Sequence, residues 1–373
     1  MRIVYITDAF AVWGGMERVL TDKMNYLTEQ YGYDVCLVTI NQGNHAIPYE
    51  LHPNVLYTDL NIRMHQQYFY HGINRLIKRK ELQRLLKQRI NDVIEELLPD
   101  IIICVKFDFI DVLLDVKGDI PLIIESHTIC KSEYIDGSGF LRRLHVRLWK
   151  RKIRKANAVV VLTDGDANDW KKINQQICII PNIVHINESG YFSSLQNKSV
   201  IYVGRFSHQK DIDSLLRIWE IVHKRHSDWY LDIYGEGELK GCYLPVVEKM
   251  NANIRIFDPT AEIMDKYCEH SVLLLTSLYE PFGLVLPEAM SCGLPVVSFD
   301  CPYGPADIIT DGADGFLIKD RSIERFSEKV CQLIENETLR IKMGQAAILS
   351  SKRYSSDKIM PQWKALFDKL VNL

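Results

Sequence analysis

The sequence has no long hydrophobic run, and this absence limits how the protein can meet a membrane. No uninterrupted apolar stretch approaches the roughly 18 residues that cross a bilayer, so any membrane contact must be peripheral. The apolar start of the chain reaches an acid at Asp8 and is too short for the core of a secretory signal. We therefore expect a cytoplasmic protein that is either soluble or attached peripherally to the cytoplasmic face of a membrane.

Paired cysteines and a strong charge of one sign are also lacking. The nine cysteines are scattered and never spaced as C-x-x-C, which argues against a disulfide framework and a zinc site. A net charge of −3 gives no electrostatic case for nucleic-acid binding. With 373 residues, 47% of them hydrophobic, the chain is long enough for two globular domains.

Short apolar runs rich in β-branched residues recur along the chain, separated by stretches with helical periodicity. Apolar on nearly every position, such runs are typical of parallel strands buried on both faces. The first set is Ile3 to Ile6, Val35 to Val38, Ile101 to Ile103, Leu122 to Ile124 and Val159 to Leu162. The second set is Ser199 to Val203, Tyr230 to Tyr234, Ile254 to Phe257, Val272 to Leu275 and Pro295 to Phe299. The pattern predicts two doubly wound α/β domains.

A polar stretch without a clear period separates the two sets. We predict an N-terminal Rossmann-like domain over residues 1–184, a linker over 185–197 and a C-terminal Rossmann-like domain over 198–353. Residues 354–373 carry Trp363, Leu366, Phe367 and Leu370 at helical spacing, which predicts a helix packing back on the first domain. Open α/β sheets bind ligands at the carboxyl ends of their strands, so we expect the substrate between the domains.

Two strand-to-helix turns could hold phosphate. Gly14 and Gly15 follow the first strand and would let backbone N–H groups approach an anion, although a plain turn would look the same. In the second domain, Gly204 and Arg205 follow the strand and Lys210 lies five residues further on. Arg205 and Lys210 could together neutralise a diphosphate, the alternative being two solvated basic side chains.

The segment Glu280-Pro281-Phe282-Gly283-Leu284 follows a strand that ends near Thr276. We expect Phe282, Gly283 and Leu284 to open a helix, with Glu288 just over one turn beyond Gly283. Carboxylates accept hydrogen bonds from hydroxyls, so Glu280 and Glu288 suit a sugar and a ribose.

These motifs together resemble retaining glycosyltransferase family 4, whose members have the GT-B fold of two facing Rossmann-like domains, and in particular members that build bacterial capsular, exopolysaccharide or lipopolysaccharide glycans. The resemblance spans both domains and implies that Arg205 and Lys210 bind the donor diphosphate, Glu280 the sugar and Glu288 the ribose. It also implies that Gly283 and Leu284 offer backbone N–H groups. His127, after the strand at Leu122 to Ile124, would bind a sugar hydroxyl, whereas the sequence alone would favour an ordinary loop histidine.

The resemblance predicts a hexosyltransferase that uses a nucleotide-diphosphate sugar, with UDP the commonest base in the family. The transferred group would be a hexose or an N-acetylhexosamine, and the acceptor a glycan, lipid-linked in surface polysaccharide synthesis. No cofactor or metal is expected, since Arg205 and Lys210 would replace the cation. We favour front-face displacement, in which the leaving diphosphate takes the acceptor's proton, over a double displacement through Glu280.

Two basic stretches could contact an anionic membrane. Arg142 to Lys155 contains eight basic residues, no acid and an apolar stripe, and Arg75 to Arg89 follows Tyr68, Phe69 and Tyr70. Solvated helix faces would show the same composition.

Three other functions have some support in the sequence. Gly235-Glu236-Gly237 follows a strand as in a nicotinamide-binding turn, although this is the second turn of its domain rather than the first. Asp164 and Asp166 could hold a divalent ion, with capping of a helix as the commoner explanation. A GT-B epimerase or phosphorylase, or a non-catalytic nucleotide-sugar-binding protein, would share the donor motifs.

Overall fold

The computed structural model describes residues 1–105, 107–130 and 140–372, without the side chains of 108 and 140–145. The chain divides into two compact units. The first contains Met1–Leu162, Asp166–Ile183 and the chain from Ile359 onward. The second contains Thr163–Gly165 and Val184–Lys358. Within the described residues, no helix is both long enough and apolar enough to span a bilayer.

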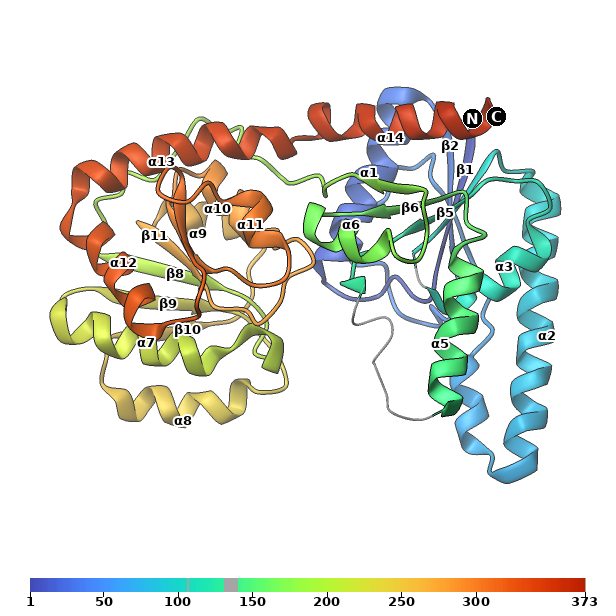
Figure 1. Cartoon of the computed structure of the whole chain (residues 1–373), viewed down its shortest axis with the longest axis horizontal. Helices are drawn as coiled ribbons and strands as arrows, with labels where there is room; N and C mark the ends of the chain where they lie inside the picture. The colour runs from blue at the N-terminus through green and yellow to red at the C-terminus, as the bar shows by residue number, and fades with distance from the viewer. Residues whose placement is uncertain (106, 131–139, 373) are drawn as a thin grey trace. The chain divides into compact units, whose positions relative to one another are not determined.

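The first unit is built on a parallel sheet of seven strands in the order β3-β2-β1-β4-β5-β6-β7 (Figure 1). The strands are β1 (Arg2–Thr7), β2 (Asp34–Thr39), β3 (Leu56–Asp59), β4 (Ile101–Cys104), β5 (Leu122–Glu125), β6 (Ala158–Val161) and β7 (Ile177–Ile179). Every residue of β4, β5 and β6 is buried, as expected of strands covered on both faces.

The helices of this unit lie between its strands along the chain, except for the C-terminal one, which follows the second unit. They are α1 (Gly15–Tyr31), α2 (Gly72–Leu97), α3 (Ile110–Val116), α5 (Phe140–Ile153), α6 (Asp164–Trp170) and α14 (Ser356–Val371), with the short 3₁₀ helices η1 (Met64–Phe69) and η2 (Phe107–Phe109). The chain order of strands reverses between β1 and β4, so the loops after these strands diverge at the carboxyl edge. This is the kind of position at which α/β sheets bind ligands.

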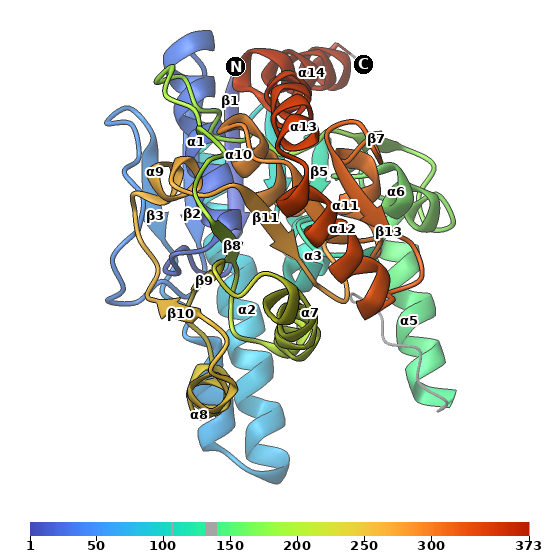
Figure 2. The same cartoon turned by 90° about the vertical axis from the view of Figure 1, so that its left-hand side faces the viewer.

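The second unit contains a parallel sheet of six strands in the order β10-β9-β8-β11-β12-β13 (Figure 2). The strands are β8 (Ser199–Val203), β9 (Tyr230–Tyr234), β10 (Ile254–Phe257), β11 (Val272–Leu275), β12 (Val296–Phe299) and β13 (Gly315–Ile318). Its helices are α7 (Ile212–Arg225), α8 (Lys240–Met250), α9 (Ile263–Cys268), α10 (Val285–Ser291), α11 (Gly304–Ile308), α12 (Ile323–Glu335) and α13 (Glu337–Ser351), with η3 (His208–Lys210) and η4 (Lys352–Tyr354). Here the strand order reverses between β8 and β11.

The prediction of two parallel, doubly wound sheets is confirmed, and all ten predicted strands are present. The pattern missed β3, β7 and β13, which extend the sheets at their edges. Residues 185–197, predicted as a linker, form no helix or strand. They are held by the second unit, where Ser193 N donates to Cys292 O at 2.9 Å.

Gly235 and Gly237, which suggested a nicotinamide turn, have a packing role. A Cβ at Gly235 would lie 2.0 Å from Gly204 O, and one at Gly237 would lie 2.5 Å from Phe206 O. The two loops are joined by Phe206 N, which donates to Glu236 O at 2.9 Å. The glycines are needed because the loops after β8 and β9 touch through their backbones.

We therefore predict that Gly235→Ala lowers the free energy of unfolding by about 1–3 kcal/mol, because a methyl group must displace the Gly204 loop. Gly241→Ala is the matched control, since nothing lies within 4 Å of that position at the start of α8. Its stability should be unchanged or higher by up to about 1 kcal/mol. Urea denaturation of both variants measures the difference, and equal stabilities would contradict the packing role.

Candidate active site

The candidate site of the second unit lies where two loops leave the sheet at the reversal of strand order. One loop follows β8 and carries Arg205 and Lys210, and the other follows β11 and carries Glu280. Leu278 N donates to Gln209 O at 2.8 Å, and Gln209 Nε2 donates to Tyr279 O at 2.9 Å. Residues some 70 positions apart in the sequence are thereby fixed against one another.

Lys210 and Glu280 form an ion pair at the centre of this junction. Lys210 Nζ lies 2.5 Å from Glu280 Oε1, and Ser277 Oγ donates to the same oxygen at 2.6 Å. The two side chains are 15% and 6% exposed, so the carboxylate depends on these partners rather than on water. Burial, followed by the negative charge of Glu280, raises the pKa of Tyr202 beneath the pair.

The backbone around the pair is fixed by groups that the sequence did not single out. Lys210 O accepts hydrogen bonds from Tyr202 Oη at 3.2 Å and Thr276 Oγ1 at 3.0 Å. Asp211 caps α7 by accepting from Ser214 N at 3.3 Å, and it also pairs with Arg321 at 2.5 Å. These side chains hold the two loops in place and leave the Lys210 ammonium directed at Glu280.

A third loop, after β12, holds Glu280 from the other side. Glu280 N donates to Pro302 O at 2.7 Å, and Tyr303 N donates to Glu280 O at 2.8 Å. Gly304 is required here, because a Cβ would lie 1.8 Å from Phe282 O. The glycine after Cys301-Pro302-Tyr303 was the available signal in the sequence for this contact.

The other predicted site residues of the second unit differ in exposure and in hydrogen bonding. Arg205 is exposed and free to reach a ligand, whereas the neighbouring Gly204 N is engaged by Tyr234 O at 3.1 Å. Gly283 has a φ of +93°, which favours glycine, and precedes α10. Glu288 on α10 is buried and accepts from Tyr267 Oη at 3.3 Å. The helix begins at Val285, slightly later than predicted.

In the first unit, Gly14 and Gly15 lie at the start of α1, as predicted. A Cβ at Gly14 would lie 2.6 Å from Glu17 Oε2, so the glycine makes room for that carboxylate. Trp13 beside it is 75% exposed and contacts the Tyr49 ring edge-on at 5.0 Å.

His127 lies just beyond β5, and its imidazole is anchored rather than free. His127 Nε2 is 3.0 Å from Glu125 Oε1, and the second oxygen of Glu125 pairs with Lys23 of α1. The His127 side chain is 6% exposed and those of Glu125 and Lys23 are each 2% exposed. The sequence identified the histidine and missed both partners, although Glu125 closes a strand that is otherwise apolar.

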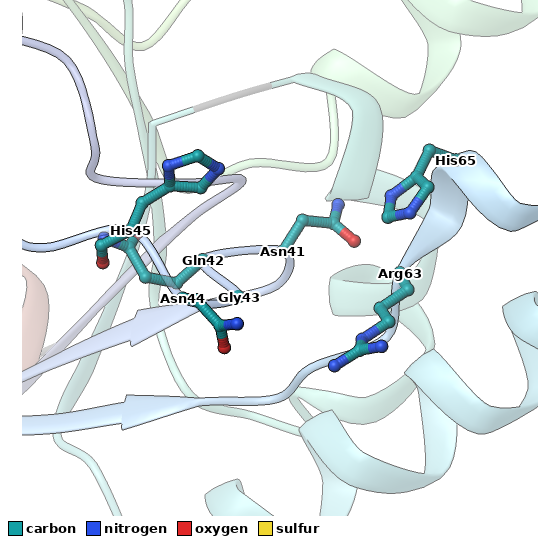
Figure 3. Close-up of a pocket in the computed structure, with 7 residues that line it drawn as sticks. All are labelled: Asn41, Gln42, Gly43, Asn44, His45, Arg63 and His65. Atoms are coloured by element: carbon teal, nitrogen blue, oxygen red, sulfur yellow. The ribbon is translucent and has the colours of Figure 1, made fainter.

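A hollow of about 340 Å³, lined mostly by residues with polar side chains, opens beside β2 and β3 in the first unit (Figure 3). The amides of Asn41 and Gln42 are used to hold its walls, since Met64 N donates to Asn41 Oδ1 at 2.9 Å and Phe10 N to Gln42 Oε1 at 2.6 Å. The exposed side chains that remain are Asn44, His45, Arg63 and His65. The hollow therefore offers hydrogen-bonding and cationic groups on a fixed backbone.

The carboxylate of Asp166 forms hydrogen bonds within the first unit. Its Oδ1 accepts from Cys130 N at 2.7 Å and its Oδ2 from Trp170 Nε1 at 2.9 Å. Both oxygens of Asp166 therefore accept hydrogen bonds from core donors, whereas the side chain of Asp164 is exposed.

Among the described residues, one group of potential metal ligands lies close together, namely His226, Cys331 and Glu335, within 4.8 Å. Arg225 lies 2.8 Å from Glu335, and its positive charge opposes a bound cation. His226 directly follows α7, at the opposite end of that helix from Lys210, and Cys331 and Glu335 lie in α12. The group is not part of the candidate site.

Two family models of glycosyltransferases match the chain, one in each half. The family model "Glycosyltransferase Family 4" matches residues 13–188, and "Glycosyl transferases group 1" matches residues 189–350. The amylovoran biosynthesis glycosyltransferase AmsD of Erwinia amylovora is 29% identical over 98% of this chain and 99% of its own. Staphylococcus aureus TarM, solved with fondaparinux, α-GlcNAc-glycerol and UDP, superposes with a TM-score of 0.78 at 18% identity, covering 98% of this chain and 99% of that one. Anabaena HepE, solved with UDP and glucose, gives 0.75 at 16% identity, covering 100% and 99%.

We predict that Lys210→Met destabilises the second unit by about 2–3 kcal/mol, because Glu280 is left buried without its cation. Lys224→Met is the control, since its partner Glu220 is a neighbour on the exposed face of α7, and little change is expected. Denaturation midpoints measure both effects. The double variant Lys210→Met with Glu280→Gln should recover much of the loss, and no recovery would show that the ion pair is not its cause.

Proposed function

The chain belongs to glycosyltransferase family 4, with the GT-B fold, and we propose that it transfers a hexose or N-acetylhexosamine with retention of configuration from a UDP-sugar to a glycan acceptor. The observation that carries the proposal is the Lys210–Glu280 pair beside the exposed Arg205. It places two cations and a carboxylate at the carboxyl edge of one sheet, where a phosphate and a sugar can be bound together.

In this proposal the cations serve the donor diphosphate. Arg205 binds phosphate oxygens through its fork, and Lys210 divides its ammonium between Glu280 and the phosphate. Glu280 accepts hydrogen bonds from the sugar, Glu288 accepts them from the ribose, and the N–H groups of Gly283 and Leu284 donate to phosphate or sugar. Phe282, Gly204, Gly14 and Gly15 complete the donor site through close backbone approach.

The reaction we propose is front-face displacement without a metal ion. Arg205 and Lys210 stabilise the charge that develops on the leaving diphosphate, which takes the proton of the acceptor hydroxyl. Glu280 is poorly suited to act as a nucleophile, because its Oε1 is already held by Lys210 at 2.5 Å and Ser277 at 2.6 Å. Its role is to orient the sugar.

The acceptor that fits best is a growing surface polysaccharide, carried on a lipid. AmsD is named for amylovoran biosynthesis, and TarM was solved with fondaparinux and α-GlcNAc-glycerol. The hollow lined by His45, Arg63 and His65 supports a polar and anionic acceptor, since it presents cationic and hydrogen-bonding groups (Figure 3).

We also propose that the first unit contacts an anionic membrane on the cytoplasmic side through α2 and α5. The end of η1 and the start of α2 expose apolar side chains, of which Phe69, Ile73, Leu76 and Ile77 are 59–75% exposed. The basic residues from Arg75 to Arg89 also lie in α2. Both helices pair with α3, through Lys87–Asp115 at 2.8 Å and Lys152–Asp111 at 2.5 Å. Apolar side chains combined with basic ones are typical of interfacial helices.

The donor is tested by thermal shift with UDP, GDP, ADP and their sugars in the presence of EDTA. A ligand at a hundredfold excess over Kd stabilises by about 2.7 kcal/mol. UDP and one UDP-sugar should stabilise the wild type, and Arg205→Ala should reduce that shift and lower kcat/KM by about 100-fold. Arg217→Ala, an exposed arginine of α7, is the control. NMR of the product should show the donor's anomeric configuration.

Inversion of that configuration would contradict the retaining mechanism, and loss of activity in EDTA would contradict metal independence. Release of free UDP without an acceptor-linked product would instead favour an epimerase or a hydrolytic function.

Membrane contact is tested by sedimentation with vesicles that contain phosphatidylglycerol. Reversing Arg147, Lys150 and Arg151 to glutamate should weaken binding by about 100-fold, because each basic residue near the surface contributes about 1 kcal/mol. Replacing Ile73, Leu76 and Ile77 by serine should also reduce binding. Lys342→Glu and Leu349→Ser, which are exposed on α13, are the matched controls. Unchanged sedimentation of the first two variants would refute the proposed surface.

A further inference from the structure

A buried ion pair in the first unit has no place in the roles assigned so far. Lys23 lies in the middle of α1 and Glu125 is the last residue of β5, and both side chains are 2% exposed. Ionised side chains are expensive to bury even as a pair, and apolar residues of similar volume are often as stable. A purely structural role therefore explains this pair poorly.

The two oxygens of Glu125 have different partners. Oε2 accepts from the ammonium of Lys23, and Oε1 lies 3.0 Å from Nε2 of His127. A carboxylate only accepts hydrogen bonds, so the proton between Glu125 and His127 must be carried by Nε2. In a neutral imidazole this leaves Nδ1 as the acceptor, and Glu125 is the only described partner of the ring.

Aromatic rings enclose the Lys23 end of this network. The ammonium lies 3.9 Å from the centroid of Trp363 and 5.1 Å from that of Tyr5. Tyr5 Oη is buried and has no hydrogen-bond partner among the described residues. Burial, followed by the charge of Glu125, raises the pKa of Tyr5, so the phenol stays neutral. The charge of Glu125 is therefore balanced by Lys23 and by contact with His127.

The electrostatics favour an ionised Glu125. Burial acts to raise the pKa of this carboxyl group, but the charges and hydrogen bonds of Lys23 and His127 outweigh it and lower the pKa to about 2. Burial also lowers the pKa of Lys23, and Glu125 opposes that effect. We take the charged pair as the state at neutral pH, because a neutral amine would leave the carboxylate buried without a cation.

We propose that Glu125 is a positioning residue that fixes His127 as the Nε2–H tautomer. The positive charge of Lys23 keeps Glu125 ionised and offsets its negative charge, so that the imidazole of His127 does not bind a second proton. The inference rests on the proposed function, in which His127 contacts the donor sugar. His127 then presents Nδ1 as an acceptor, so the sugar hydroxyl that it meets must donate.

The tautomer is measured directly by NMR of ¹⁵N-histidine-labelled protein, with His127→Asn used to assign the signal. The wild type should show a protonated Nε2 and an unprotonated Nδ1 near pH 8. In Glu125→Gln the amide can donate to Nε2, so this preference should be lost or reversed. An Nδ1–H tautomer in the wild type would overturn the proposal, and this measurement does not depend on any transferase activity.

Kinetics separate positioning from structural support. Glu125→Gln should lower kcat/KM by about 10–100-fold, in the range seen when outer-shell partners of functional histidines are removed. Stabilisation by UDP should persist, because Arg205, Lys210 and Glu288, the residues proposed to bind the diphosphate and the ribose, belong to the second unit. Lys23→Met should shift the acid limb of the kcat/KM profile to higher pH, because Glu125 then favours the imidazolium.

The double variant Lys23→Met with Glu125→Gln controls for folding, since it removes both charges and should be more stable than Lys23→Met alone. We expect it to stay as inactive as Glu125→Gln. If activity instead recovers with stability, or if the acid limb does not move in Lys23→Met, the pair is structural only and the proposal is wrong. If the wild type transfers no sugar while the tautomer is as expected, the proposed function fails and the positioning does not.

Discussion

The Lys210–Glu280 ion pair is the interaction on which the candidate active site depends. It joins the loop after β8 to the loop after β11, at the position where the strand order of the second sheet reverses. Because neighbouring parallel strands send their following loops in opposite directions at such a position, something must hold the loops together. Here a hydrogen-bonded ion pair does so with groups that also suit a phosphate and a sugar.

Burial explains part of the success in predicting strands from the sequence, although β10 was predicted without any fully buried residue and β13 was missed despite complete burial. β4, β5, β6 and β11 are buried throughout and read as continuous apolar runs. β3 is largely exposed and contains Thr58 and Asp59, so it gives no such run, whereas β7 is an apolar run of only three partly buried residues. β13 begins at Gly315, where a Cβ would meet Val296, and a leading glycine weakens the strand pattern.

Sequence patterns likewise identified only some of the residues of the candidate site. Arg205, Lys210 and Glu280 could be found because they stand in motifs next to strands, but their supports could not. Tyr202, Ser277 and Pro302 act through hydrogen bonds that exist only once the loops are folded together. A motif gives the residues that meet a ligand, whereas the residues that fix them are set by tertiary contacts that no local spacing encodes.

Lys23–Glu125 and Lys210–Glu280 are alike in a way that bears on function. Each joins a carboxylate at or just beyond the carboxyl end of a strand to a lysine from an element after the first strand of its unit. Burying an ion pair yields little net stability, so two such pairs at the ligand-binding edges of both sheets are poorly explained by folding alone. In the proposed function, the lysine of one pair, Lys210, itself binds a phosphate. In the other pair the lysine is enclosed by Trp363 and Tyr5, and its charge can reach a ligand only through Glu125 and His127. Under the proposed function, the same pair of residue types would supply a direct contact to the ligand in one unit and an indirect one in the other, and burial of the ammonium would decide which.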